Sequence, residues 1–284
     1  MTIEERYQSF VRTLDRPLDA GEIDFFGINL YDRTEENIAF KLYYAQKYST
    51  CSTHPLAQYL QQHDMLRYLS EVEDTLHRKD MRMDLALKNR TDTGMEALFS
   101  VLRRENELFA DCEQEVRNLA KMCITDEPGC SLASLYHLGS IEHGTWKQLL
   151  KFHFFTRWCR NHNYPGKDSE YRDAYYLEYL QNTGIAEYCR ITEVSETILA
   201  GCGGHLLTAG MDAGRNGYRK YKLYIKHPER LYQGLLEHVG AQFSGQIHQV
   251  MAWNEKHLEF QAEIVALCLD TDGVFSVNLY YGIR

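Results

Sequence analysis

The sequence predicts an α/β fold in which a ten-stranded antiparallel barrel with a polar lumen is surrounded by helices. Five pairs of segments alternate apolar and polar side chains with a period of two, which is typical of β-hairpins. Segments with helical periodicity separate the pairs, so hairpins and helices form an irregular internal repeat. In several of the second strands a basic residue is followed two positions later by an aromatic one. Closing such a sheet into a barrel removes both edges and encloses the polar face.

The composition is typical of a soluble globular protein. The chain has 284 residues, of which 44% are hydrophobic, and a net charge of −9. No apolar run is long enough to span a membrane, and the first residues do not resemble a signal peptide. The negative charge argues against nucleic acid as a partner. The eight cysteines form no CxxC pair, so free thiols in a reducing cytoplasm are expected. No linker divides the repeats, and we expect a single domain over residues 1–284.

The first half of the chain contains two predicted hairpins and three predicted helices. We expect helices at residues 3–15 and 55–63 and from residue 93 onward. The first hairpin has strands at 24–31 and 38–45 around a turn at 33–37. The second hairpin ends in a strand at 80–88. Thr93 and Glu96 have the spacing of a capping box, which marks the start of the third helix. The pair Pro128-Gly129 marks its end.

The second half contains three further hairpins and four helices. We expect hairpins at residues 135–156, 208–226 and 258–281, a turn at 163–167, and helices at 169–182, 191–200, 228–240 and 245–255. Gly184 and Gly201 are predicted to end the first two of these helices, and Pro228 suits the first turn of the third. The later hairpins turn at Arg215-Asn216-Gly217 and at residues 270–273.

The fourth hairpin shows the two-faced pattern most clearly. One face of its second strand carries Tyr221, Leu223 and Ile225, and the other carries Lys220, Lys222 and Tyr224. The simplest interpretation is a polar face in water, where charged side chains usually lie. A solvated face, however, gives no reason for the basic and aromatic order to recur between repeats, so an enclosed polar face is favoured.

An enclosed polar face of this kind predicts a site for a diphosphate. Basic residues stand at equivalent positions of four repeats, namely Lys41, Arg82, Lys151 and Lys222. Gathered cations repel one another unless an anion shares the space, and each oxygen of a diphosphate accepts charge-assisted hydrogen bonds. Two positions further along their strands, Tyr43, Tyr224 and Tyr280 would form an adjacent ring. Aromatic faces stabilise a carbocation and exclude water from it.

These residues carry a resemblance to a known family. The order of helices and hairpins, with Lys-x-Tyr on alternate strands, resembles the soluble prenyltransferases of the prenyltransferase-barrel (ABBA) fold. The stretch TAGMDAGR…KYKLYIKHPERL, residues 208–231, is similar to the corresponding part of the cyanobactin peptide prenyltransferases, as is NLYY at 278–281. The resemblance in architecture covers nearly the whole chain, whereas the resemblance in sequence covers about one repeat.

The resemblance implies transfer of a C5 to C15 isoprenyl group from its diphosphate to an electron-rich side chain or ring. By the match of repeats, the residues that would hold the diphosphate are Lys41, Lys151, Lys222 and, in the second repeat, Arg82. The same match implies that Tyr43, Tyr224 and Tyr280 shield the cation, and that His153 takes the shielding position in the third repeat.

The sequence departs from the family at the expected base. Members that prenylate peptide hydroxyls carry a glutamate on the first strand, where this chain has Gly27. Asp84 is our preferred substitute, because its place in the repeat predicts a carboxylate that faces the lumen. Glu142, Asp212 and Glu263 are weaker candidates. An acidic residue there could instead bind a basic acceptor such as a guanidinium.

The expected activity is therefore transfer of a C5 to C10 isoprenyl group, for example from dimethylallyl diphosphate, to a nucleophilic side chain of a peptide. The peptide would be a cyclic ribosomal natural product (RiPP) of the cyanobactin kind. The alternatives are prenylation of a small aromatic such as an indole or phenol, and non-catalytic binding of an anionic ligand. The histidines lack the spacing of a protein-held metal site, so Mg²⁺, if it takes part, would arrive on the diphosphate. The oligomeric state stays open.

Overall fold

The computed structural model describes the chain apart from residues 15–17, 19–20, 32–37, 45–57, 59–60, 63–65, 75–78, 88–95, 97–98, 101, 105–106, 124–130, 143–144, 156–166 and 240. For residues 44, 66–74, 79–87, 121–123, 131–142, 145–149, 155, 167–172 and 241–242 only the backbone is described. The strands are β1 Ile23–Tyr31, β2 Ile38–Tyr44, β3 Leu66–Asp74, β4 Lys79–Leu87, β5 Ser131–Glu142, β6 Thr145–Phe155, β7 His205–Ala213, β8 Arg219–Lys226, β9 Phe260–Asp270 and β10 Phe275–Ile283. The helices are α1 Ile3–Thr13, α4 Glu107–Cys123, α5 Lys167–Gln181, α6 Ala186–Cys202, α7 Leu231–His238 and α8 Ala241–Asn254.

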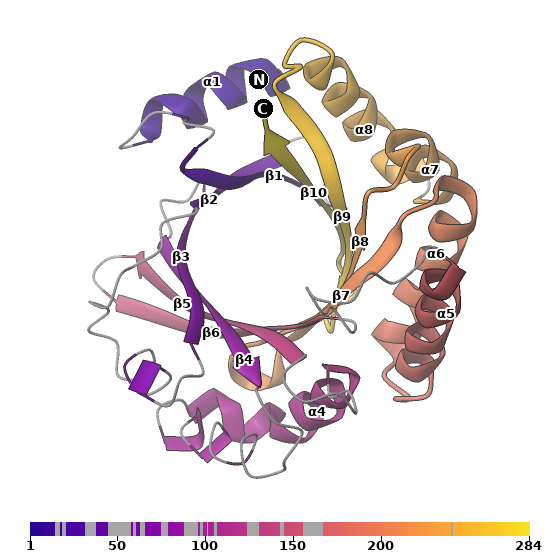
Figure 1. The fold of residues 1–284 in the computed structure, drawn as a ribbon. Coiled ribbons are helices and arrows are strands. Elements are labelled where there is room, and N and C mark those ends of the chain that lie inside the picture. The colour runs from indigo at the N-terminus through magenta and orange to yellow at the C-terminus, as the bar shows by residue number, and fades with distance from the viewer. Residues whose placement is uncertain are drawn as a thin grey trace.

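The strands form one curled antiparallel sheet with helices on its outer side (Figure 1). Hydrogen-bonded neighbours follow the order β1-β10-β9-β8-β7-β6-β5-β4-β3-β2, and β2 pairs in turn with β1, so the pairings form a closed circuit. Five of the ten strand pairings are hairpins and four more join strands that follow one another in the sequence, so nearly all neighbours are consecutive along the chain. The predicted antiparallel sheet with its helical cover is confirmed.

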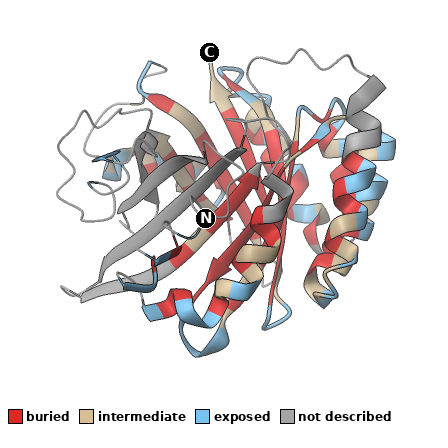
Figure 2. Cartoon of the chain, turned by 60° about the horizontal axis from the view of Figure 1, so that its bottom comes forward, coloured by how far each residue is buried: buried red, intermediate tan, exposed pale blue. Residues whose placement is uncertain are grey.

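The apolar face of the strands packs outward against the helices. One cluster joins α4, α5 and α6 to β6, β7 and β8, and a second joins α1, α7 and α8 to β1, β2, β9 and β10. In the second cluster the rings of Phe26 and Trp253 stack with centroids 5.6 Å apart, and both side chains are buried. Figure 2 shows the buried residues concentrated along the strands and on the helix sides that face them. Outward burial of the apolar face leaves the other face of the sheet for the interior.

Both predicted ends of the helix at 191–200 are wrong, and the backbone shows why. The helix predicted from residue 191 begins at Ala186, directly after a turn at Gly184, and no side chain caps its start. Gly201 lies inside its last turn, and Gly203 (φ 71°) is the C-terminal cap. No capping side chain marks the start of this helix, so the local sequence carries no signal for it.

Pro228 was predicted in the first turn of the next helix, but α7 begins only at Leu231. The backbone N–H of Glu229 donates to the carbonyl oxygen of Cys202 at 2.8 Å, so this segment is bound to the end of α6 before α7 starts. His227 precedes Pro228 with a positive φ of 52°, which turns the chain there.

The other predicted boundaries agree with the strands to within a few residues, although β5 and β7 begin earlier than expected. The helix predicted at 55–63 is described only at residues 58, 61 and 62, which are helical. The turns at 33–37 and 163–167 and the pair Pro128-Gly129 lie outside the described residues. Four cysteines are described as free thiols, as predicted: Cys112, Cys189, Cys202 and Cys268. Within the described segments, none of the helices has the length and apolar character needed to cross a membrane.

Candidate functional site

The inner face of the sheet carries its own cluster of side chains, separate from the two outer clusters. Its buried members are Tyr224, Ile264, Ala266, Cys268 and Tyr280, and Phe25, Tyr43 and Leu207 pack against it. These residues alternate along their strands with outward-facing ones, as the period of two requires. In β8, for example, Leu223 belongs to one outer cluster and Ile225 to the other, whereas Tyr224 between them faces inward. The inner face is therefore enclosed by the sheet itself.

The four predicted shielding residues form a continuous surface, which we call the aromatic wall (Tyr43, Tyr280, Tyr224 and His153). The ring centroids of Tyr43 and Tyr280 are 5.5 Å apart, and those of Tyr280 and Tyr224 are 5.9 Å apart. His153 meets Tyr224 edge to face at 5.1 Å. These spacings lie in the range of direct aromatic contact. Residues from β2, β6, β8 and β10, far apart in the sequence, thus form one surface.

A hydrogen bond and a glycine fix one end of the aromatic wall. His153 Nε2 and the Tyr224 hydroxyl are 2.7 Å apart, and both side chains are buried. Gly210 of β7 lies between the two strands, and a Cβ there would stand 3.3 Å from an atom of each ring. On the outer side, the hydroxyl of Tyr188 in α6 donates to the Gly210 carbonyl oxygen at 2.8 Å. The absence of a side chain at residue 210 lets the two rings meet across β7.

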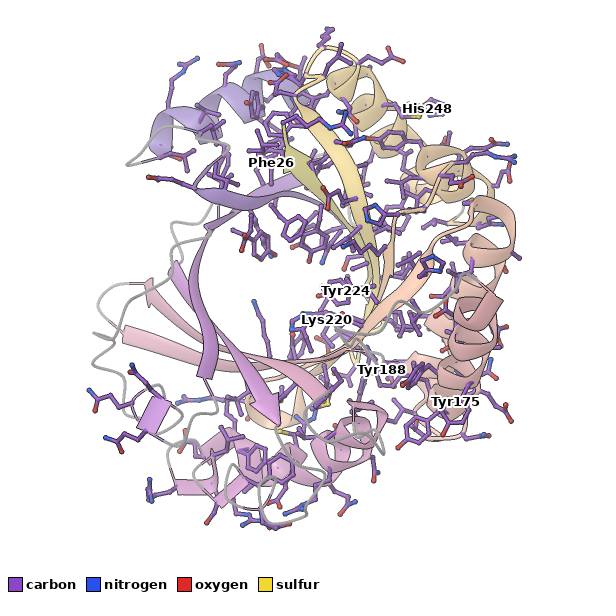
Figure 3. All side chains as sticks on the ribbon, viewed as in Figure 1. Phe26, Tyr175, Tyr188, Lys220, Tyr224 and His248 are labelled. Carbon is purple, nitrogen blue, oxygen red and sulfur yellow. The ribbon has the colours of Figure 1, made fainter. Side chains whose placement is uncertain are left out.

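Cations gather on the same inner face, on the hairpin-turn side of the aromatic wall. Lys222 lies two residues before Tyr224 in β8 and forms an ion pair with Asp212 of β7, and both side chains are buried. In the backbone register Lys151 of β6 lies opposite Asp212, and Asp212 lies opposite Lys220 of β8. We refer to Lys151, Lys220 and Lys222 as the cation group. Figure 3 shows Lys220 and Tyr224 on the same side of the sheet, toward the centre of the ring of strands.

The electrostatics of the cation group reflect crowding of like charges. Burial lowers the pKa of Lys222; Asp212 opposes this shift, while Lys151 and Lys220 add to it. Burial alone would also lower the pKa of Lys220, but nearby acidic groups outweigh it and the pKa is raised. The Nζ atom of Lys220 lies 5.6 Å from the ring centroid of Tyr31. Lys151 and Lys220 both lower the pKa of Lys222, so negative charge added beside these three lysines would relieve their mutual repulsion.

Lys41 stands at the other end of the aromatic wall. It is half-buried in β2, two residues before Tyr43, and its register partner in β1 is Gly27. A Cβ on Gly27 would be 3.4 Å from the Tyr43 ring and 3.5 Å from the Lys41 Cβ, which is ordinary contact. The position at which the family resemblance implies a glutamate therefore faces the interior beside Lys41 and carries no side chain.

Three predicted site residues lie on strands of which only the backbone is described. Arg82 pairs with Tyr136, which pairs with Lys151, and Asp84 pairs with Ser134, which pairs with His153. Their register thus places Arg82 two strands from Lys151 and Asp84 two strands from His153. Glu142 is the last residue of β5 and pairs with Thr145 at the hairpin end. The side chains of Arg82, Asp84 and Glu142 lie outside the described residues.

Several interior groups were not singled out from the sequence. Cys268 is buried opposite Lys222, and Asn278 is buried two residues before Tyr280. The Nδ2 group of Asn278 donates to the Cys268 sulfur at 3.5 Å. The signal that could have found them is the same period of two that located Tyr280, applied to the rest of β9 and β10. Among the described residues, three or more His, Cys, Asp or Glu side chains do not gather in an arrangement that could hold a metal ion.

Solved structures resemble the fold, although sequence comparisons do not identify relatives. No protein-family model matches the chain, and no curated protein matches its sequence. The crystal structure of AnaPT from Neosartorya fischeri matches with a TM-score of 0.53 and 8% identity, over 93% of this chain and 79% of that chain. The structure of NotF prenyltransferase matches with a TM-score of 0.52 and 11% identity, over 92% of this chain and 80% of that chain. The chain shares their ABBA-type fold, whereas the narrower resemblance to the cyanobactin enzymes is unconfirmed.

Proposed function

We propose that residues 1–284 form one domain that transfers an isoprenyl group from an isoprenyl diphosphate to an electron-rich acceptor inside a ten-stranded barrel. The observation that carries this proposal is the position of the aromatic wall next to the cation group along β8, where Lys220, Lys222 and Tyr224 alternate onto one face. A diphosphate leaving group needs cations, and the allylic cation that it leaves behind needs aromatic faces and exclusion of water. The fold shared with NotF prenyltransferase supports the same reaction.

The donor would bind with its diphosphate on the cation group. Lys222 would exchange part of its ion pair with Asp212 for phosphate oxygens, with Lys151 and Lys220 beside it. Charge-assisted hydrogen bonds to phosphate oxygens are about twice as strong as neutral ones. Arg82 would contribute from β4, and the contribution of Lys41, which stands at the other end of the aromatic wall, stays a prediction from the sequence. Mg²⁺, where present, would be carried by the diphosphate oxygens rather than by protein carboxylates.

The reaction would proceed beside the aromatic wall. The bond between the allylic carbon and the diphosphate oxygen breaks, the oxygen retains the electron pair, and the acceptor's electron pair forms the new bond to carbon. Burial raises the pKa of Tyr280 well above its usual value, so its hydroxyl stays neutral and does not act as the base. The acceptor's proton would pass to a carboxylate, for which Asp84 remains our first candidate, with Asp212 and Glu142 as alternatives.

A small aromatic acceptor, such as an indole or a phenol, is better supported than a peptide. The peptide prediction depended on the resemblance of residues 208–231 to one subfamily, and no family model matches the chain. The first-strand glutamate of the enzymes that prenylate peptide hydroxyls is replaced by Gly27. Tyr224 and Tyr280 are only 7% and 8% exposed, so the aromatic wall lies in the interior, which a small planar ring would enter more readily than a peptide.

Release of diphosphate from dimethylallyl diphosphate, measured with and without indole, tests the proposal and the choice of base together. We expect indole to accelerate release in the wild type. The Asp84→Asn variant should slow turnover while the dissociation constant of the donor stays within about twofold. If Asp212→Asn slows turnover in this way and Asp84→Asn does not, Asp212 is the base. A protein that binds the donor and never releases diphosphate would instead be a binder of anionic ligands.

A further inference from the structure

The Asn278 side chain ends in an oxygen that is buried without a hydrogen-bond partner in the described part of the chain. Asn278 lies on the inner face of β10 and is 6% exposed. Its Nδ2 group donates to Cys268, whereas the buried Oδ1 atom finds no donor among the described residues. Buried carbonyl oxygens are usually hydrogen-bonded, and leaving one unpaired costs free energy that a ligand can recover.

The surroundings of Asn278 place this oxygen between the aromatic wall and the cation group. In the backbone register Asn278 lies opposite Ala266 of β9, which lies opposite Tyr224 of β8. The next inward-facing positions toward the hairpin turns are Cys268 and Lys222. Ala266 carries only a methyl group between Asn278 and Tyr224, and Tyr280 lies two residues from Asn278, so the Asn278 side chain lies beside the aromatic wall, where the allylic carbon and the acceptor would meet.

The chemistry of the oxygen decides what it can bind. An amide oxygen only accepts hydrogen bonds, as do the oxygens of an ionised diphosphate, so the Oδ1 atom does not bind the donor's anionic group. A ligand that satisfies it must present N–H or O–H. Of the two proposed substrates, only the aromatic acceptor carries such a group, on an indole nitrogen or a phenol oxygen.

We infer that Asn278 is a specificity-determining residue that accepts a hydrogen bond from the N–H or O–H of the aromatic acceptor. This inference rests on the proposed function. It also supplies an acceptor contact from β10 in a chain whose first strand has Gly27 in place of a carboxylate. Sites built to hydrogen-bond a polar hydrogen reject analogues that lack it, because the buried partner is then left unpaired.

Calorimetric binding of indole and 1-methylindole, with inorganic diphosphate present, tests the inference without requiring turnover. The wild type should bind indole at least about tenfold more tightly than 1-methylindole, since the analogue leaves the oxygen unpaired. Asn278→Leu, which has a similar shape without polar atoms, should bind both compounds within about threefold of each other. Asn278→Asp, which keeps an accepting oxygen, should retain the preference for indole.

A matched control lies directly across the strand pair. Asn29 of β1 is the register partner of Asn278, and its Nδ2 group donates to the Tyr31 hydroxyl at 3.3 Å. Asn29→Leu should therefore leave the preference for indole intact. The inference is overturned if Asn278→Leu keeps the wild-type preference, or if the wild type binds the two indoles equally. Because this readout is binding, absence of prenyl transfer would count against the proposed function and not against the role of Asn278.

Discussion

The Nε2 atom of His153 lies 2.7 Å from the hydroxyl oxygen of Tyr224, so a buried hydrogen bond joins β6 to β8 across β7. The strand between them contributes Gly210, which is the register partner of both His153 and Lys222. The same backbone position thus supports one end of the aromatic wall and borders the cation group. A change at this glycine should affect the shape of the site before it affects the rest of the fold.

Gly210→Ala should destabilise the protein, whereas Gly27→Ala should not. The new methyl group at residue 210 would stand 3.3 Å from atoms of His153, Tyr224 and the Phe152 carbonyl. Overpacking of this kind costs about 1–3 kcal/mol. At Gly27 the nearest atoms are 3.4 Å away, so alanine is accommodated and should change stability by less than about 1 kcal/mol. Urea unfolding of both variants measures the difference, and equal stabilities would show that the rings do not depend on Gly210.

Lys222→Met should lose donor affinity and stability, and a second substitution should restore only the stability. Removing Lys222 leaves the buried carboxylate of Asp212 without its main partner, which costs about 3–5 kcal/mol in buried pairs. The double variant Lys222→Met/Asp212→Asn removes that charge and should recover most of the loss. Its affinity for dimethylallyl thiolodiphosphate should still fall at least about tenfold, because a charged hydrogen bond to the diphosphate is missing. Calorimetry measures the affinity of the double variant for this analogue. An affinity equal to that of the wild type would exclude Lys222 from the diphosphate site.

Donor affinity should fall as the pH rises. The fall should begin at a lower pH than it would if Lys222 had the pKa of an ordinary lysine. Burial lowers the pKa of Lys222, and only the protonated amine attracts the diphosphate. As the pH rises through this lowered pKa, the amine loses its proton and the affinity should drop by up to about tenfold per pH unit. Lys222→Arg keeps its charge throughout, so its affinity should stay level over that range. A wild-type curve that remains level up to about pH 10 would contradict this assignment.

The aromatic wall should protect the allylic cation from water. Tyr280 contacts both Tyr43 and Tyr224, so it is the central member of the aromatic wall. Tyr280→Leu removes a cation–aromatic interaction worth about 2 kcal/mol in a desolvated site and should raise the share of dimethylallyl alcohol among the products. Tyr280→Phe keeps the ring and serves as the control. Chromatographic product ratios that do not differ between the Leu and Phe variants would remove Tyr280 from the shielding role.

The alternation of faces was predictable because burial imposes it directly. Each strand has a period of two, so Leu223 and Tyr224 had to face opposite sides, and the outer clusters confirm this for the described strands. The repeat then aligned Tyr43, Tyr224 and Tyr280, and in the structure the Tyr280 ring contacts the rings of both other residues. Local patterning sufficed here because all neighbouring strands except β1 and β10 are consecutive in the sequence.

The remaining features depend on distances that no local pattern encodes. The choice of Lys222 rather than Lys220 as the ion-pair partner of Asp212 depends on side-chain reach, since Lys220 is the register partner. The room that Gly210 provides depends on rings from β6 and β8 that are 71 residues apart. The start of α6 was predicted at residue 191 instead of Ala186. No side chain caps the start of this helix, so the local sequence does not mark it.

Mass spectrometry of reaction products tests the central claim most directly. The purified protein would be incubated with dimethylallyl or geranyl diphosphate and Mg²⁺, together with indole, phenol and a panel of cyclic peptides. We predict the mass gain of one isoprenyl unit on an aromatic acceptor, reduced in the Lys222→Met/Asp212→Asn variant. Gain on the peptides alone would restore the peptide prediction. Binding of the diphosphates without transfer to any acceptor and without hydrolysis would contradict the assignment of this chain as a prenyltransferase.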